Sequence, residues 1–169
     1  HSTSRRQRQM CIRDRIDWAE AHMAVLVALR QKYQMIRPLE GVRVAGCLHV
    51  TKETGVLIRT LKTAGAEISW CGCNPLSTQD DVAASLAKDE SVSVFASRGV
   101  STKQYYDDIH SVIGFDPNIT VDDGADLIVE MHKNINKSKS IVYGGTEETT
   151  TGVIRLRACL LYTSPSPRD

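Results

Sequence analysis

The chain has 169 residues, of which 41% are hydrophobic and 24% are charged, and this composition is ordinary for one globular domain. No apolar run approaches the roughly 20 residues that a membrane span needs, so we expect no membrane partner. Five cysteines are an odd number and do not indicate a disulfide framework. No signal-peptide pattern follows the first residues, so the sequence favours a cytoplasmic protein.

The net charge of +1 conceals an uneven distribution. Residues 1–15 carry five arginines against one aspartate, whereas residues 16–158 carry 15 basic and 18 acidic residues. A basic arm of this kind can bind nucleic acid, in which case the affinity would disappear when residues 1–15 are removed. We expect instead that residues 1–15 and residues 159–169 are non-native read-through sequence. The domain is then residues 16–158, without a nucleic-acid partner.

Helical and apolar patterns alternate along this central region. Amphipathic spacing predicts helices, and short apolar runs predict buried strands. In chain order we expect a helix at 17–34, a strand at 42–49, a helix at 51–64, a strand at 66–71, a helix at 77–86, a strand at 92–96, a helix at 102–113, a strand at 118–121, a helix at 125–132, a strand at 140–143 and a helix at 148–157. Strands joined by crossover helices imply an α/β fold with a doubly wound, mostly parallel sheet flanked by helices.

Local signals mark several boundaries in this series. Thr51 is expected to cap the helix that follows it, and Ser77-x-x-Asp80 has the form of a capping box. Gly144-Gly145 is expected to let the backbone turn sharply after the last strand. Residues 133–139 are expected to form a polar connection.

Chemistry-bearing residues follow the ends of four expected strands. Ligands of open parallel sheets bind beyond the carboxyl ends of the strands, so we expect these residues to share one edge. They are His49, Thr51 and Glu53 after the first strand, Cys73, Asn74, Ser77 and Asp80 after the second, Asp122, Asp123 and Asp126 after the fourth, and residues 144–152 after the fifth.

The segment from Thr146 to Thr151 offers two carboxylates, four hydroxyls and the free N–H groups of a helix start. Carboxylates suit ribose hydroxyls, so this set favours a nucleoside site, although simple helix capping would use some of the same residues. Adjacent carboxylates such as Asp122 and Asp123 point to opposite faces of a strand. Cys71-Gly-Cys73 lacks a second cysteine pair, so we expect no metal. No Gly-x-Gly-x-x-Gly pattern occurs, so the segment is not itself a dinucleotide-binding half.

Five segments together resemble the adenosylhomocysteinase family. They are Trp18-Ala-Glu-Ala-His-Met, Leu48-His-Val-Thr-Lys-Glu-Thr54, residues 72–84, Asp122-Asp-Gly-Ala-Asp126 and Gly144-Gly-Thr-Glu-Glu-Thr-Thr-Thr-Gly152. The resemblance covers residues 16–158 and only the amino-terminal, substrate-binding part of the family. It implies that the NAD-binding domain lies outside this chain, which is then a fragment without turnover of its own.

The resemblance implies NAD-dependent, reversible hydrolysis of S-adenosyl-L-homocysteine to adenosine and homocysteine, within the methylation cycle. In that family NAD oxidises the ribose 3′-hydroxyl, homocysteine is eliminated, water adds, and the sugar is reduced again. Some archaeal relatives prefer the inosyl substrate, and the fragment leaves that choice open. The full-length form is expected to be a homotetramer.

The same resemblance assigns roles residue by residue. Thr51 and Glu53 match adenine contacts, and His49 lies near the leaving sulfur and the ribose. Asp123 and Glu148 match the ribose-binding and acid–base carboxylates, while Ser77 lies near the substrate. The threonines that match contacts to NAD are Thr149, Thr150 and Thr151.

The alternative is a stand-alone binding module of the flavodoxin or response-regulator type. A phosphoacceptor domain needs an acidic pair after the first strand, an aspartate after the third and a lysine after the fifth. This chain has His49, Ala96 and Gly144 at those places, which argues against that reading.

Overall fold

A computed structural model describes residues 15–89, 92–133 and 141–163, and side chains through residue 159. The expected arm, apart from Arg15, and residues 164–169 of the expected tail lie outside the described residues, as does most of the expected loop at 133–139. The strands are β1 (Arg43–Cys47), β2 (Glu67–Cys71), β3 (Ser93–Phe95), β4 (Ile119–Asp122) and β5 (Gly144–Glu147). The helices are α2 (Ala24–Tyr33), α3 (Lys52–Thr63), α4 (Asp80–Asp89), α5 (Thr102–Ile113), α6 (Asp126–Lys133) and α7 (Thr150–Thr163).

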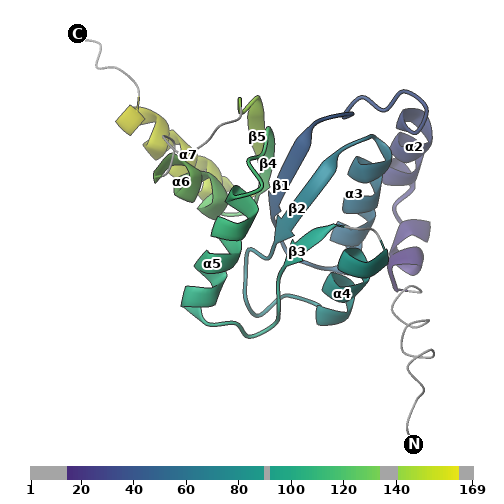
Figure 1. Ribbon diagram of the computed structural model, residues 1–169, viewed down its shortest axis with the longest axis horizontal. Helices are drawn as coiled ribbons and strands as arrows, with labels where there is room; N and C mark the ends of the chain where they lie inside the picture. The colour runs from purple at the N-terminus through teal and green to yellow at the C-terminus, as the bar shows by residue number, and fades with distance from the viewer. Residues whose placement is uncertain (1–14, 90–91, 134–140, 164–169) are drawn as a thin grey trace, which may run out of the picture.

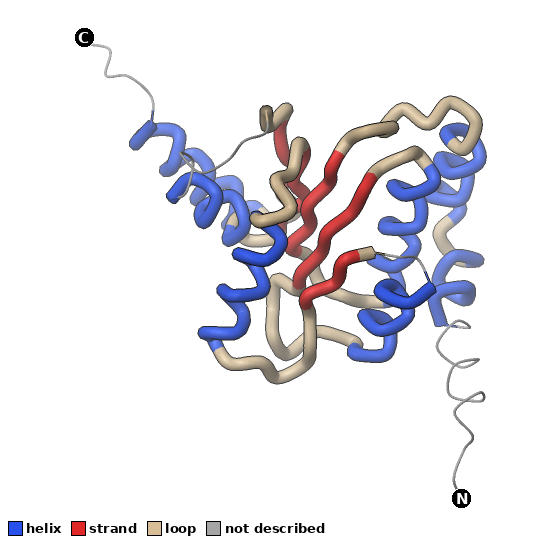
Figure 2. Tube along the Cα trace, in the orientation of Figure 1, coloured by secondary structure: helices blue, strands red, loops and turns tan. Residues whose placement is uncertain are grey.

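The five strands form one sheet in the order β3-β2-β1-β4-β5, and every described pair is parallel. Helices α3 and α4 pack on one face, and α5 and α6 pack on the other. The sheet separates these two helical layers in Figures 1 and 2. The predicted α/β, doubly wound architecture is therefore confirmed.

Strands β2 and β3 lie on one side of β1 within the sheet, and the chain then returns to form β4 on the other side of β1. Strand β1 pairs with β2 and also with β4, which is 72 or more residues later in the chain. The helices that follow β1 and β4, α3 and α6, lie on opposite faces. Their loops part at this point, which is the place where open α/β sheets leave a crevice at the carboxyl ends of the strands.

The expectation of one continuous helix near the amino-terminal end of the domain was wrong. The single helix expected at 17–34 is a helical stretch at 15–21, a break at His22 and Met23, and then α2. Glu20 explains how the two pieces stay together, because its carboxylate accepts hydrogen bonds from Arg30 of α2 and Arg59 of α3. Arg59 also pairs with Asp17 at 2.7 Å.

The carboxyl-terminal boundaries were also displaced. The strand expected at 140–143 is β5 (Gly144–Glu147), so Gly144 and Gly145 belong to the strand and do not form a turn. Gly145 is needed there for a close approach, since a Cβ would lie 2.3 Å from Thr120 Oγ1. The last helix, α7, continues to Thr163 beyond the expected end at residue 157.

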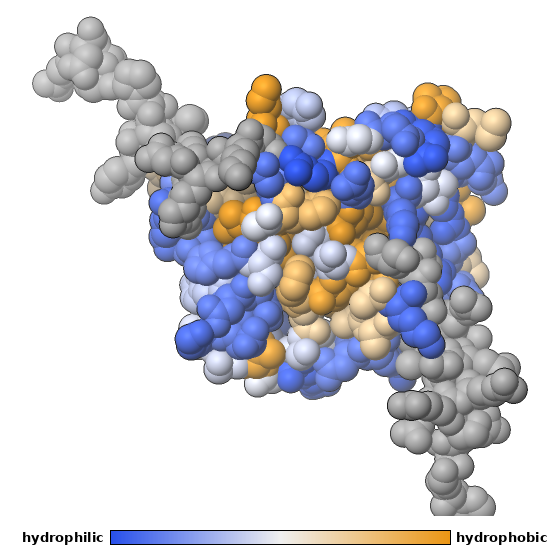
Figure 3. Space-filling view, in the orientation of Figure 1, coloured by the Kyte–Doolittle hydropathy of each residue, from blue (hydrophilic) through white to orange (hydrophobic). Residues whose placement is uncertain are grey.

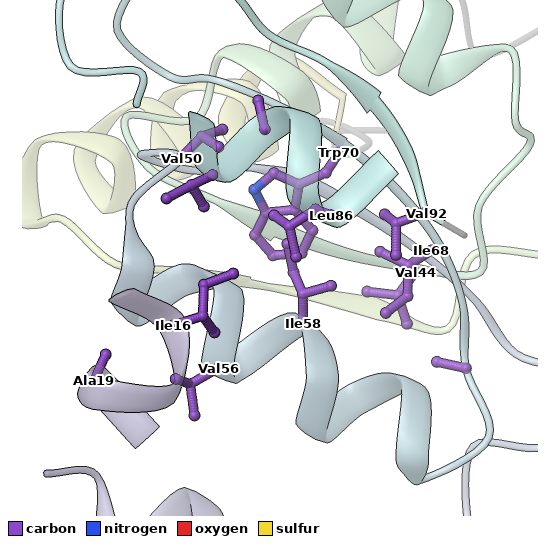
Figure 4. Packing of buried hydrophobic residues seen from close by; sticks show 13 residues of the cluster. Ile16, Ala19, Val44, Val50, Val56, Ile58, Ile68, Trp70, Leu86 and Val92 are labelled. Atoms are coloured by element: carbon purple, nitrogen blue, oxygen red, sulfur yellow. The ribbon is translucent and has the colours of Figure 1, made fainter. Parts of the chain in front are cut away.

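Trp70 fills the centre of the larger core cluster. Its ring is fully buried and lies among Ile58, Leu86 and Val44 (Figure 4). Its partner in β1 is Gly46, where a Cβ would lie 2.2 Å from the indole. The strand therefore needs a residue without a side chain opposite the largest buried ring. Figure 3 shows apolar side chains gathered over the middle of one face, with hydrophilic side chains around them.

We predict that Gly46→Ala lowers the free energy of unfolding by about 1–3 kcal/mol, because the added methyl group overpacks the Trp70 ring. Gly144→Ala is the matched control, since nothing lies within 4 Å of its Cβ position. That change should stay within about 1 kcal/mol. Urea denaturation of the two variants measures the difference, and equal midpoints would refute the packing argument.

A second prediction concerns acid stability. Arg30, with help from Arg59, holds the pKa of Glu20 below its ordinary value of 4.5. A depressed pKa stabilises the fold above the ordinary pKa, and this stabilisation is lost as the pH falls through the folded-state pKa. Glu20→Gln should therefore cost about 1 kcal/mol at pH 7 and much less at acid pH. Glu40→Gln, at the exposed ion pair with Arg37, is the control and should cost no more than about 0.5 kcal/mol at pH 7. Denaturation midpoints across the pH range test this.

Candidate functional site

His49 and Asp123 meet where the loops after β1 and β4 part. The Nε2 atom of His49 lies 3.2 Å from Asp123 Oδ2, although the two residues are far apart in the chain. The backbone N–H of Asp123 donates to the Cys47 carbonyl at 3.0 Å, which ties the loop after β4 to the end of β1. The pair therefore rests on strand ends and not on a free loop.

Ser77 approaches His49 from the loop after β2. Its Oγ lies 2.6 Å from His49 Nδ1 and donates to the Asn74 carbonyl at 3.0 Å. The capping-box prediction for Ser77 was wrong, because α4 begins at Asp80 and the hydroxyl faces the histidine. Ser77, His49 and Asp123 thus form a continuous polar chain across the edge of the sheet.

Cys73 completes this cluster and was undervalued by the sequence reasoning. Its Sγ donates to Asp123 Oδ2 at 3.2 Å. Burial and the nearby Asp123 carboxylate raise the pKa of the Cys73 thiol far above its ordinary value. Tyr105 holds the same loop, since its hydroxyl donates to Asp126 at 2.8 Å and lies 3.2 Å from the Cys73 carbonyl. The strand-end rule placed Cys73 at this edge, but only the fold shows its partners.

Asp122 and Asp123 have different surroundings, as their positions on opposite faces predict. Asp122 is buried, and its two oxygens accept from the backbone N–H groups of Asp123 and Ile128, each at 3.0 Å. Burial raises the pKa of Asp122 to about 6, although the two backbone hydrogen bonds act to lower it. Asp122 therefore anchors the start of α6, and Asp123 alone enters the cluster.

Glu147 lies in the segment expected at this edge, but its backbone partners were not predicted. Its carboxylate accepts the backbone N–H groups of Gly124, Ala125 and Thr149 at 2.8, 3.0 and 2.9 Å. Burial alone would raise the pKa of Glu147, but these N–H groups hold it below its ordinary value. A Cβ at Gly152 would lie 2.2 Å from this carboxylate, so the glycine lets α7 approach it. Glu147 thus joins the loop after β4 to the start of α7.

The segment after β5 lies beside Asp123. The backbone N–H of Glu148 donates to the Asp122 carbonyl at 3.0 Å, and the Glu148 side chain is exposed. The Thr149 hydroxyl donates to Glu147 at 2.7 Å and accepts from the Gly152 N–H at 3.0 Å, which makes it the cap of α7. Thr150 and Thr151 are exposed in the first turn.

Thr51 and Glu53 flank His49 on the other side. Thr51 caps α3 as predicted, since its hydroxyl accepts from the Thr54 N–H at 3.5 Å. Glu53 is exposed in the first turn of α3. The Thr54 hydroxyl donates to the His49 carbonyl at 2.6 Å and fixes the loop between β1 and α3. His49, Ser77, Asp123 and Glu148 therefore follow the carboxyl ends of their strands, and His49 contacts both Ser77 and Asp123, whereas Gly144 and Gly145 lie within β5.

Comparison with known proteins identifies relatives of the chain. The family model described as S-adenosyl-L-homocysteine hydrolase matches residues 7–143. A protein of Sulfolobus acidocaldarius named adenosylhomocysteinase is 53% identical over 146 residues, covering 86% of this chain and 34% of the relative. One of Aquifex aeolicus with the same name is 51% identical over 144 residues, covering 85% of this chain and 34% of the relative. A protein of Methanosarcina mazei named S-inosyl-L-homocysteine hydrolase is 48% identical over 144 residues, covering 85% and 35%.

The chain thus spans about a third of the length of these curated relatives. Within the described residues, no helix is both long enough and apolar enough to cross a membrane.

We predict that Glu147→Gln lowers the free energy of unfolding by about 1–3 kcal/mol, because its carboxylate bonds three backbone N–H groups. Amide hydrogen exchange should accelerate at Gly124, Ala125 and Thr149. Glu148→Gln is the matched neighbour, exposed at its side chain, and should stay within about 0.5 kcal/mol. Equal losses in the two variants would show that Glu147 does not tie the two segments together.

Proposed function

Because this chain belongs to the S-adenosyl-L-homocysteine hydrolase family, we propose that it forms the nucleoside-binding part of an enzyme that hydrolyses S-adenosyl-L-homocysteine reversibly to adenosine and homocysteine. The observation that carries the proposal is the polar chain of Ser77, His49 and Asp123, beside the segment from Glu148 to Thr151. It lies at the crevice where open α/β sheets bind ligands.

Asp123 is suited to hold the ribose. Its Oδ2 accepts from Cys73 and lies 3.2 Å from His49 Nε2. Both of these contacts are to Oδ2, so Oδ1 can accept a ribose hydroxyl. Glu148 presents an exposed carboxylate on the next loop, where it can hold or move a second sugar proton.

His49 is suited to handle a proton near the leaving sulfur. Ser77 fixes the ring through Nδ1 at 2.6 Å, and Nε2 lies 3.2 Å from Asp123 Oδ2. Its side chain is 43% exposed, so a substrate can reach it. Ser77 acts through the histidine as a positioning residue, because a fixed ring keeps Nε2 aimed at one point.

The start of α7 fits NAD. Thr150 and Thr151 are exposed and can donate hydrogen bonds. The Thr149 hydroxyl already donates its hydrogen bond to Glu147, so toward a ligand it can only accept. These three threonines would hold the nicotinamide end of the cofactor. When bound, NAD supplies the hydride acceptor for the ribose 3′-position. We place the domain that carries the rest of the NAD site in the remaining two thirds of the relatives' length.

Thr51 and Glu53 would bind the base. An ionised carboxylate only accepts hydrogen bonds, so Glu53 suits the exocyclic amino group of adenine and not the carbonyl oxygen of hypoxanthine. We therefore propose the adenosyl substrate over the inosyl one. We also propose, from the family alone, that the whole protein is a cytoplasmic homotetramer.

The decisive experiment titrates the purified 169-residue chain with adenosine by calorimetry. We expect binding in wild type and a clear loss of affinity in Asp123→Asn and His49→Asn, because both remove contacts to the sugar. His110→Asn, where the imidazole on α5 contacts the buried Glu130 carboxylate of α6, is the control and should bind as wild type does. Unchanged adenosine affinity in both site variants would refute the proposed site.

Base preference is a separate prediction. Adenosine should bind more tightly than inosine, by about tenfold or more for one charge-assisted hydrogen bond. Glu53→Gln should lower the ratio of adenosine affinity to inosine affinity, because an amide can also donate a hydrogen bond to the hypoxanthine carbonyl. If Glu53→Gln leaves the ratio of the two affinities unchanged, Glu53 does not contact the base.

The chain alone should release no homocysteine from S-adenosyl-L-homocysteine, because the proposed oxidant domain is absent. Turnover by this chain without added protein would contradict the proposed division of labour.

A further inference from the structure

Three side chains of different chemistry converge at the edge between β1 and β4. His49 Nε2 and Cys73 Sγ each lie 3.2 Å from Asp123 Oδ2. The ligand atoms of the three residues all lie within 4.8 Å of one another. The sequence predicts no metal, because Cys71-Gly-Cys73 has no second cysteine pair nearby in the chain. The fold supplies the missing histidine and carboxylate from other loops.

Two of the three spacings between these atoms, those to Asp123 Oδ2, are close to those of a tetrahedral zinc site. Zinc binds nitrogen and oxygen at about 2.0–2.2 Å and sulfur at about 2.3 Å. Tetrahedral angles then place nitrogen about 3.4 Å and sulfur about 3.6 Å from the oxygen ligand. The observed 3.2 Å distances need to increase by only a few tenths of an ångström. Side-chain rotation alone can supply such a shift.

Ser77 also prepares the histidine for a metal. The Ser77 hydroxyl gives its single proton to the Asn74 carbonyl, so its oxygen accepts from His49 Nδ1–H at 2.6 Å. In the neutral ring this leaves the Nε2 lone pair directed toward Asp123. A histidine whose other nitrogen donates to an outer partner is typical of metal ligands.

We propose that His49, Cys73 and Asp123 form a binding site for a divalent transition metal ion of the zinc class, with a fourth position open to water. One imidazole, one thiolate and one carboxylate are the donor set that such ions take, and a three-residue set leaves an open position. The exposed fractions of the His49 and Asp123 side chains, 43% and 13%, leave an approach from solvent.

Metal binding replaces the S–H bond of Cys73 by a bond between Sγ and the metal, and the proton goes to solvent. No change of oxidation state is involved. The metal and a ribose would both use His49 and Asp123, so an ion here would exclude the nucleoside. That last consequence rests on the proposed function, whereas metal binding itself does not.

The test titrates the full 169-residue chain with Co²⁺ alone, under reducing conditions and without nucleoside. Cobalt reports its own ligands, because a thiolate gives a charge-transfer band in the near ultraviolet and tetrahedral geometry gives strong visible bands. We expect one equivalent of Co²⁺ with both signatures, and displacement of Co²⁺ by Zn²⁺. Cys73→Ser should abolish the charge-transfer band, and Cys159→Ser, its matched control, should retain it.

Further variants keep the test decisive if Cys73→Ser folds poorly. His49→Asn and Asp123→Asn should each weaken Co²⁺ binding beyond the roughly 10- to 100-fold that loss of an outer partner costs. Ser77→Ala should weaken binding within that range and keep the spectrum. Circular dichroism confirms that each variant is folded.

Several results would overturn the site. These are no binding at millimolar Co²⁺, a charge-transfer band that survives Cys73→Ser, or one that disappears in Cys159→Ser. Unchanged affinity in both His49→Asn and Asp123→Asn would do the same. Adenosine titration of the metal-free chain tests the nucleoside site independently. A chain that binds Co²⁺ but not adenosine would refute the nucleoside site only, and a chain that binds adenosine but not Co²⁺ would refute the metal site only.

Discussion

One carboxylate oxygen, Asp123 Oδ2, brings together three loops that are far apart in the sequence. It contacts His49 from the loop after β1 and Cys73 from the loop after β2, and Asp123 itself follows β4. The oxygen can hold this place because the Asp123 backbone is tied to the end of β1. The adjacent carboxylate, Asp122, turns the other way and anchors α6. Both proposed ligands, the nucleoside and the metal ion, depend on this arrangement.

Glu147 extends the same edge to the fourth loop. Its carboxylate accepts N–H groups from Gly124, in the loop between β4 and α6, and from Thr149, in the loop between β5 and α7. Gly152 leaves room for this carboxylate. A polar group placed in this way costs little to bury, because several donors satisfy it. Glu148 and the exposed threonines are consequently held beside Asp123, and the side chains proposed for sugar and cofactor share one rigid support.

The alternation of patterns was enough to predict the parallel sheet and its helical layers, since crossover helices permit few other arrangements. It also predicted the edge on which His49, Ser77 and Asp123 meet. The predictions failed where tertiary contacts determine the ends of helices and strands. The break at His22 and the start of β5 at Gly144 depend on packing between segments distant in sequence. Cys73 and Glu147 were missed as partners because their contacts are 50 and about 22 residues away, beyond any local spacing rule.

The strand order has a consequence for how the molecule is made. Strands β1, β2 and β3, with α3 and α4, are contiguous in the chain and share the cluster around Trp70. A ribosome releases this half first, and it can gather its apolar residues before β4 emerges. β4 must then return across the sheet to pair with β1, a late and non-local closure that costs more chain entropy than the local pairings. Ligand binding would therefore report that β4 has been made and paired, since a truncated or stalled chain ending before Ile119 would hold a core without a site.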